Sequence, residues 1–250
     1  MNIKKYLYVA NWKNYFTYHQ ANNWISSHHD ALATLAANNT IVICPSFEAL
    51  SSINVLIGQT NIKLGAQNCS SHNVGPFTGH VLIESLKELG CSYCIIGHPE
   101  VQKVCSENLE QLAKKAERLL EYGITPLVCI GETAQDYELS HGDDKIRIAL
   151  ESFCDSLPTK GMVHTTIGIA YEPLWAVNSD STPPVAYIED QLRLAKEVCT
   201  RMAPNYTFLF LYGGGIDETN VREFKNIDIL DGFLIGRAST DFQKLQKIVG

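Results

Sequence analysis

No stretch of this 250-residue sequence is apolar for long enough to span a membrane. The apolar run near its start, YLYVA (6–10), is too short for the core of a signal peptide, so we expect a cytoplasmic protein. Basic residues are also few, since 20 Lys and Arg stand against 27 Asp and Glu, a formal charge of −7. This balance argues against nucleic acid or an anionic membrane as the main partner, but a small anion can still bind at a local positive site.

The sequence also lacks any Gly-, Ser- or Pro-rich linker, low-complexity segment or visible repeat, so we expect a single domain over residues 1–250. Its eight cysteines lie mostly in strand-like or helix-like segments, which is typical of buried free thiols and not of a disulfide framework. Cys91 and Cys94 have the spacing of a metal or redox pair, but no second such pair exists. We therefore expect no metal site.

Short apolar runs with strand-like composition recur along the whole chain. They cover residues 6–11, 40–45, 62–67, 93–97, 125–131, 166–173, 208–214 and 232–236. These runs are continuously apolar instead of alternating, as expected of parallel strands covered on both faces.

Helix-like segments lie between these runs, and they are clearest at 107–122, 144–157, 187–202 and 240–249. Alternation of strands with helices indicates βαβ crossovers. Eight such units in about 250 residues match an α/β fold in which eight parallel strands form a closed barrel ringed by helices. A doubly wound open sheet is the alternative.

In a barrel of this kind, functional residues lie at the carboxyl ends of the strands. The polar and glycine residues that follow the apolar runs are Asn11, Lys13, Gln67, Asn68, His98, Glu100, Glu132, Glu172, Gly213, Gly214, Gly215, Gly236 and Arg237. Glycine turns after strands seven and eight can present backbone N–H groups to an anion. The pattern indicates acid–base chemistry on a small phosphorylated metabolite.

Eight short motifs carry a resemblance that extends over most of the chain. They are NWK (11–13), GAQN (65–68), PFTG (76–79), GHPE (97–100), CIGE (129–132), AYEPLWA (170–176), YGGG (212–215) and GFLIG (232–236). In this order and at this spacing, the sequence resembles the triosephosphate isomerases. The resemblance implies a TIM barrel that interconverts dihydroxyacetone phosphate and D-glyceraldehyde 3-phosphate, in glycolysis and gluconeogenesis, without metal or organic cofactor.

The resemblance also implies a role for each matching residue. Glu172 matches the general base, His98 the neutral electrophile and Lys13 a fixed positive charge, while Asn11 matches a polar contact and Glu100 the partner of the lysine. These roles come from the family, which is itself the standard example of a glutamate base beside a neutral histidine. The residues matching the phosphate-binding positions are Asn178, Gly213, Gly214, Gly215, Gly236 and Arg237.

The sequence departs from the family pattern next to these positions. Pro99 replaces a serine, and the stretch VNSDSTPP (177–184) lacks the glycines of the closing loop. Gly215 replaces a serine and Arg237 a glycine, so the guanidinium either binds phosphate or points to solvent. Two alternatives therefore stay open: an isomerase of another small ketose or aldose phosphate, or a weakly active barrel that binds phosphorylated ligands.

Assembly is expected from the resemblance as well. Phe77, Thr78 and Gly79 match the loop that enters the neighbouring subunit of a homodimer. Val101-Gln102 and His80 stand where the family has the two sides of an ion pair across that interface, so both sides have changed together. We expect a homodimer with a repacked interface.

Overall fold

The computed structural model describes residues 4–158, 162, 164–176 and 183–250. Its parallel strands pair in chain order, and β1 also pairs with β8, which closes the sheet into a barrel. The strands are β1 (Leu7–Asn11), β2 (Thr40–Cys44), β3 (Lys63–Ala66), β4 (Cys91–Ile96), β5 (Thr125–Ile130), β6 (Thr166–Tyr171), β7 (Thr207–Tyr212) and β8 (Gly232–Ile235). Each overlaps its predicted segment, so the barrel is confirmed and the open sheet is wrong.

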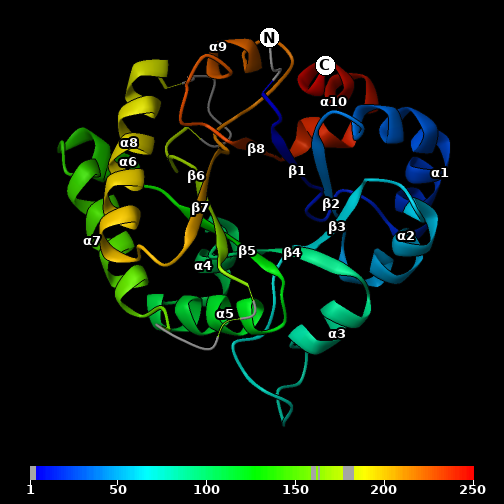
Figure 1. Cartoon of the computed structure of the whole chain (residues 1–250), viewed down its shortest axis with the longest axis horizontal. Helices are drawn as coiled ribbons and strands as arrows, with labels where there is room; N and C mark the ends of the chain where they lie inside the picture. The colour runs from blue at the N-terminus through cyan, green and yellow to red at the C-terminus, as the bar shows by residue number, and fades with distance from the viewer. Residues whose placement is uncertain (1–3, 159–161, 163, 177–182) are drawn as a thin grey trace.

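Helices surround the strands on all sides (Figure 1). The α-helices are α1 (Tyr18–Leu35), α2 (Leu50–Ile57), α3 (Ile83–Glu88), α4 (Pro99–Cys105), α5 (Leu109–Glu121), α6 (Ala134–Glu138), α7 (Gly142–Asp155), α8 (Val185–Met202), α9 (Val221–Phe224) and α10 (Phe242–Val249), and the 3₁₀ helices are η1 (Phe47–Ala49) and η2 (Arg237–Thr240). No helix in the described part of the chain is long and apolar enough to cross a membrane.

The last helix begins later than its sequence pattern predicts. The pattern predicts a helix from residue 240, but Thr240 ends η2 and α10 begins at Phe242. Asp241 then caps α10, because its side chain accepts hydrogen bonds from the backbone N–H groups of Gln243 and Lys244. The short η2 turn therefore stands apart from the long helix, directly after β8.

Strand side chains alternate between two apolar layers. One layer fills the barrel interior and consists of Leu7, Val9, Val42, Cys44, Ile95, Leu127, Cys129, Ala170, Leu211 and Leu234. The other layer packs against the helices, for example through Tyr8 and Ile43. Because both layers are buried, the strands read as continuously apolar.

The same alternation positions the polar residues. Asn11 follows Leu7 and Val9 at two-residue spacing, and Glu172 follows Ala170 in the same way. Both side chains therefore face the barrel interior at the carboxyl end, where the apolar filling stops.

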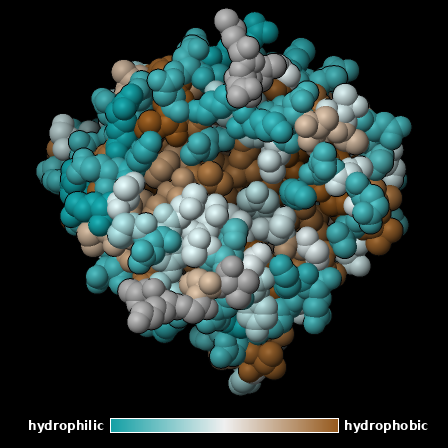
Figure 2. Space-filling model, viewed as in Figure 1, coloured by the Kyte–Doolittle hydropathy of each residue, from teal (hydrophilic) through white to brown (hydrophobic). Residues whose placement is uncertain are grey.

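The loop between β3 and α3 extends away from the barrel at the bottom of Figure 1. Residues 73–80 of this loop are all exposed. Its apolar side chains include Val74, which is 75% exposed, and Phe77, which is 37% exposed. In the same view, Figure 2 shows hydrophobic residues at this lower tip, next to hydrophilic ones.

Candidate active site

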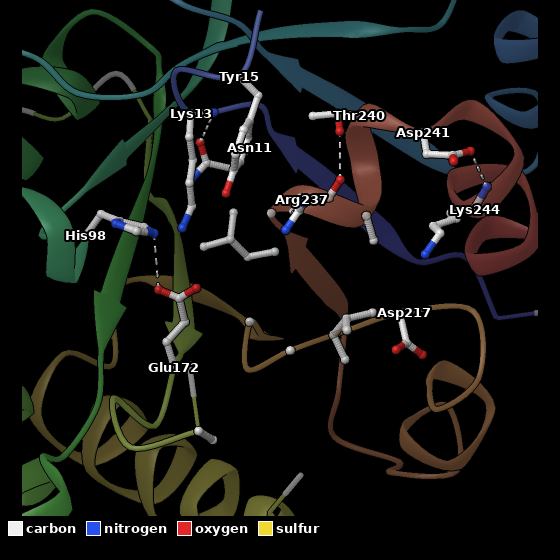
Figure 3. A pocket seen from close by; sticks show the side chains of 17 residues that line it. Asn11, Lys13, Tyr15, His98, Glu172, Asp217, Arg237, Thr240, Asp241 and Lys244 are labelled. Atoms are coloured by element: carbon white, nitrogen blue, oxygen red, sulfur yellow. Dashed lines mark hydrogen bonds and ion pairs between the residues drawn. The ribbon is translucent and has the colours of Figure 1, made fainter. Parts of the chain in front are cut away.

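A cavity of about 620 Å³ opens at the carboxyl end of the strands (Figure 3). Its lining comes from β1 and β8, from the segments that follow β1, β4, β6, β7 and β8, and from α10. The lining residues are Asn11, Lys13, Tyr15, His98, Glu172, Ala176, Gly213, Gly215, Ile216, Asp217, Leu234, Gly236, Arg237, Ala238, Thr240, Asp241 and Lys244. Asn11, Lys13, His98 and Glu172, which lie far apart in the sequence, thus meet in one pocket.

Lys13 is held in place by its backbone. It adopts a left-handed conformation with φ of 47°, which non-glycine residues rarely adopt. Its N–H donates to Asn11 Oδ1 at 3.2 Å, and its carbonyl accepts from Gln67 Nε2 at 2.7 Å. Gln67 Nε2 also donates to the carbonyl of Cys44 at 3.0 Å, so three strand ends fix this segment.

The ammonium group of Lys13 forms an ion pair with Glu100. Nζ lies 2.6 Å from Glu100 Oε1, and the carboxylate is more than half exposed while the lysine side chain is only one-fifth exposed. Glu100 belongs to the first turn of α4, next to His98. The pair therefore joins the ends of β1 and β4 and keeps the positive charge of Lys13 at the pocket floor.

His98 is the N-cap of α4, and its side chain is buried. Its Nδ1 accepts a hydrogen bond from the backbone N–H of Glu100 at 3.3 Å. Because Nδ1 acts as the acceptor, a neutral ring must carry its proton on Nε2. Nε2 lies 3.5 Å from Glu172 Oε2, so the N–H donor faces the pocket (Figure 3).

Burial lowers the pKa of His98 to about 4, and the charge of Lys13 acts in the same direction against the weaker opposing effect of Glu100. The imidazole is therefore neutral at physiological pH. A neutral imidazole can donate a hydrogen bond to a carbonyl oxygen without first giving away a proton.

Glu172 is held tightly at the end of β6. Its backbone N–H donates to the carbonyl of Ile130 at 2.8 Å. Gly131 and Gly213 on the neighbouring strands leave the necessary space, since a Cβ on Gly131 would overlap the Glu172 carbonyl oxygen and one on Gly213 would lie 2.5 Å from Glu172 Cγ. These two glycines are required by close approach.

Burial raises the pKa of Glu172 to about 8; Lys13 opposes this shift and Glu100 adds to it. Its Oε2 is buried and has no hydrogen-bond partner among the described residues. Pro99, the first residue of α4, brings neither an N–H nor a hydroxyl to this region. A carboxylate with few partners and an elevated pKa is suited to accept a proton.

Glu132 is fully buried behind this site and does not line the cavity. Its Oε1 accepts from Trp175 Nε1 at 2.7 Å and from the hydroxyls of Tyr171 and Tyr187, each at 3.0 Å. The carboxylate therefore ties the end of β5 to β6, to the segment after Glu172 and to α8. This supports a structural role for Glu132, although it follows a strand like the other candidates.

The turns after β7 and β8 form the opposite side of the cavity. Gly215 has a φ of 65°, and its carbonyl accepts from Asn220 Nδ2 at 2.8 Å. A Cβ on Gly236 would reach only ordinary contact distance from Lys13, which places the β8 turn beside the lysine. Arg237 follows at the start of η2 and lies between Asn11 and Lys244 in the view of Figure 3.

Charges at this end of the cavity are unevenly paired. Lys13 pairs with Glu100, and Lys244 Nζ lies 3.8 Å from Glu218 Oε1. Arg237, in contrast, has no carboxylate within 4.0 Å of its guanidinium in the described part of the chain. It is an exposed cation at the rim, available to an anion.

Some predicted site residues lie elsewhere. Gly214 does not line the cavity, because its Cα faces the hydroxyl of Tyr212. Phe77, Thr78 and Gly79 lie on the extended loop after β3, outside the cavity. Asn178 lies outside the described residues, as do Asp180 and Ser181.

The sequence patterns missed several residues that line the cavity, namely Tyr15, Asp217, Thr240, Asp241 and Lys244. Asp217 and Lys244 lie beyond the first residues after their strands, on a later turn and on α10. Neither strand-end position nor the matching motifs identify such residues, because they reach the cavity through the packing of later turns and of α10. No group of three metal-ligating side chains occurs among the described residues.

Comparisons with known proteins agree with this geometry. The family model described as "Triosephosphate isomerase" matches residues 6–250. The chain is 34% identical over 245 residues to the triosephosphate isomerase of Wolbachia sp. subsp. Brugia malayi (strain TRS), covering 98% of this chain and 96% of that one. It is 33% identical over 258 residues to the triosephosphate isomerase of Aquifex aeolicus (strain VF5), covering 97% and 98%. The chain therefore belongs to the triosephosphate isomerase family, a family of isomerases.

Proposed function

We propose that this protein interconverts dihydroxyacetone phosphate and D-glyceraldehyde 3-phosphate by proton transfer through an enediolate. The observation that carries the proposal is the pair formed by Glu172 and His98. A buried carboxylate of raised pKa lies 3.5 Å from the ring nitrogen of a neutral imidazole. Base and hydrogen-bond donor are therefore adjacent, as abstraction of a proton next to a carbonyl requires.

Each group has one task in this reaction. The carboxylate of Glu172 removes a proton from the carbon next to the substrate carbonyl and returns it to the neighbouring carbon. His98 Nε2–H donates to the two substrate oxygens, on which negative charge develops. Lys13 stabilises the same charge by its fixed ammonium group, with Asn11 as a polar contact and Glu100 holding the lysine.

The phosphate group belongs at the turns after β7 and β8. Gly213, Gly215 and Gly236 line this side of the cavity. The Gly213 N–H donates to the carbonyl of Tyr171, so we assign the anion to the N–H groups of the turns at Gly215 and Gly236. Arg237 adds a guanidinium that no carboxylate of the described residues pairs, and a guanidinium can bind phosphate through two parallel hydrogen bonds. We propose Gly214 and Asn178 as further members of this site on the resemblance alone.

A second candidate is an isomerase of another small ketose or aldose phosphate. The exposed Arg237 favours it, because a side chain at this turn changes the shape and charge of the phosphate end. We keep it as the alternative to the triose phosphate substrate.

We also propose that the protein acts as a cytoplasmic homodimer. The extended loop that carries Phe77, Thr78 and Gly79 supports the dimer, because its apolar side chains are exposed at the tip. His72 stacks on Phe77 with ring centroids 4.0 Å apart, which stiffens the loop for insertion into a second copy. The free and mostly buried cysteines of the described chain support a reducing compartment such as the cytoplasm.

A coupled assay on D-glyceraldehyde 3-phosphate tests the proposed function, with Glu172→Gln as the matched control. We expect turnover by the wild type and a loss of at least a thousandfold in kcat for the variant, because the amide cannot accept the proton. Activity only on a longer sugar phosphate would favour the second candidate. Phosphate binding without turnover of either substrate would indicate a barrel that only binds such ligands.

A further inference from the structure

Trp24 links α1 to the turn that carries the phosphate end of the cavity. The indole is buried, with 9% of the residue exposed. Its Nε1 donates to the carbonyl oxygen of Thr240 over 2.8 Å. Thr240 is the last residue of η2, and Arg237 is the first.

The other side-chain hydrogen bonds of η2 join residues within the turn or directly before it. Thr240 Oγ1 donates to the carbonyl of Arg237 at 2.8 Å, and Ser239 Oγ donates to the carbonyl of Gly236 at 2.7 Å. Among the described residues, no side chain outside the turn other than Trp24 hydrogen-bonds to residues 236–240. Apart from the packing of Ala238 and the buried Ser239, the indole N–H is therefore what links η2 to α1.

The same ring also packs on the segment that carries the reactive groups. Trp12 lies between Asn11 and Lys13 and contacts Trp24 edge to face, with ring centroids 4.9 Å apart. Phe242, at the start of α10, packs on the ring at 5.9 Å. One indole thus contacts the Lys13 segment through Trp12, η2 through Thr240 and α10 through Phe242.

We propose that Trp24 is a positioning residue that sets the distance between the isomerising groups and the phosphate-binding turn. Without its N–H, the Thr240 carbonyl loses its partner, and the turn that carries Gly236 and Arg237 shifts relative to Lys13. Such small displacements weaken both backbone and bidentate contacts to a bound anion. The inference deepens the proposed function and rests on it only for the identity of the phosphorylated substrate.

The test replaces the donor while keeping an aromatic ring, Trp24→Phe. Calorimetry measures the affinity for inorganic phosphate. Steady-state kinetics measure KM and kcat/KM for D-glyceraldehyde 3-phosphate and for unphosphorylated D-glyceraldehyde. We expect about fivefold to tenfold weaker phosphate binding, a similar rise in KM for the phosphorylated substrate, and unchanged kcat/KM for D-glyceraldehyde. Arg237→Gln provides the benchmark for a direct loss of phosphate affinity.

Tyr206→Phe is the matched structural control, since it also removes an aromatic donor to a backbone carbonyl, that of Pro158 at 2.5 Å, but at the far end of the barrel. It should leave all three measurements unchanged. The proposal would be overturned if Trp24→Phe lowered kcat/KM equally for both substrates. It would also be overturned if the variant had a lower melting temperature but bound phosphate normally.

Thr240→Val removes the hydrogen bond from Thr240 Oγ1 to the Arg237 carbonyl within the same turn. It therefore tests whether the turn controls phosphate binding if Trp24→Phe does not fold. Unchanged phosphate affinity in Thr240→Val would mean that the turn does not control the phosphate end. If the wild type bound phosphate but isomerised no substrate, the proposed function would fail, and the calorimetric comparison would still judge the role of Trp24.

Discussion

Burial acts in opposite directions on the two ionisable groups at the centre of the cavity. It raises the pKa of Glu172 to about 8 and lowers that of His98 to about 4, because each charged form is disfavoured away from water. At pH 7 only about a tenth of Glu172 is ionised in the free protein. In the free protein, the ionised form of Glu172 that acts as the base is thus a minor population, while His98 is nearly always neutral.

We therefore predict a single ascending limb in the pH profile of kcat/KM. Below pH 8 the Glu172 carboxyl is protonated and cannot act as the base, so the value should rise about tenfold per pH unit from pH 6 and level off above pH 8. His98 gains its proton only near pH 4, outside this range. Initial rates at low substrate concentration measure the profile, and a flat profile between pH 6 and 9 would contradict the pKa of Glu172.

The site residues directly after the strands could be predicted from the sequence, because the carboxyl ends of the parallel strands all lie at one rim of the barrel. Asn11, Lys13, His98 and Glu172 meet in the cavity for this reason. Lys244 was not predictable, since it lies on α10 and reaches the rim only through the packing of that helix. The departures at Pro99 and Arg237 were visible in the sequence, but only the structure shows an unpartnered Glu172 Oε2 and an Arg237 without a carboxylate among the described residues.

Among the elements, β5, β6 and α8 are joined by one buried carboxylate. Glu132 accepts three hydrogen bonds, from Tyr171, Trp175 and Tyr187. The sequence motif CIGE marks the residue but not its partners, because they come from β6, from the segment after Glu172 and from α8. Likewise, apolar periodicity alone assigned residues 240 and 241 to the last helix, and the cap formed by Asp241 moved the boundary.

We predict that Glu132→Leu destabilises the protein by about 2–5 kcal/mol, since it leaves one buried and two partly buried donors without their acceptor. Urea unfolding measures the loss. Activity should also fall, because Trp175 follows the catalytic strand end and loses its anchor. Glu189→Gln, which removes only a surface pair with Arg193, is the control and should unfold like the wild type. A urea midpoint of Glu132→Leu equal to that of the wild type would show that the carboxylate does not hold these elements together.

At the scale of the whole molecule, the eight strand–helix units of the sequence predicted the barrel. The structure shows that the pairing of β1 with β8 closes it. The single-domain organisation and the dimer stay predictions. Assembly could not be predicted from apolar patterning, because the extended loop is short, and its exposed apolar residues Val74 and Phe77 are separated by Gly75 and Pro76 and flanked by polar residues.

We predict a dimer of about twice 27.8 kDa in light scattering after gel filtration. Phe77→Asp should shift the protein toward the monomer, because it places a charge on the apolar tip of the extended loop. Ile148→Asp, on the exposed face of α7, is the control and should stay dimeric. A wild-type monomer at micromolar concentration would contradict the proposed assembly.

Proton transfer by Glu172 is tested most directly by isomerising dihydroxyacetone phosphate in D₂O and following the product by NMR. The proton on Glu172 exchanges with solvent while the enediolate is bound, because the cavity opens at the rim. We predict deuterium at carbon 2 of the D-glyceraldehyde 3-phosphate formed by the wild type, and neither product nor deuterium above background with Glu172→Gln. Product formed wholly without deuterium, or normal labelled turnover by the variant, would contradict a Glu172-mediated enediolate mechanism.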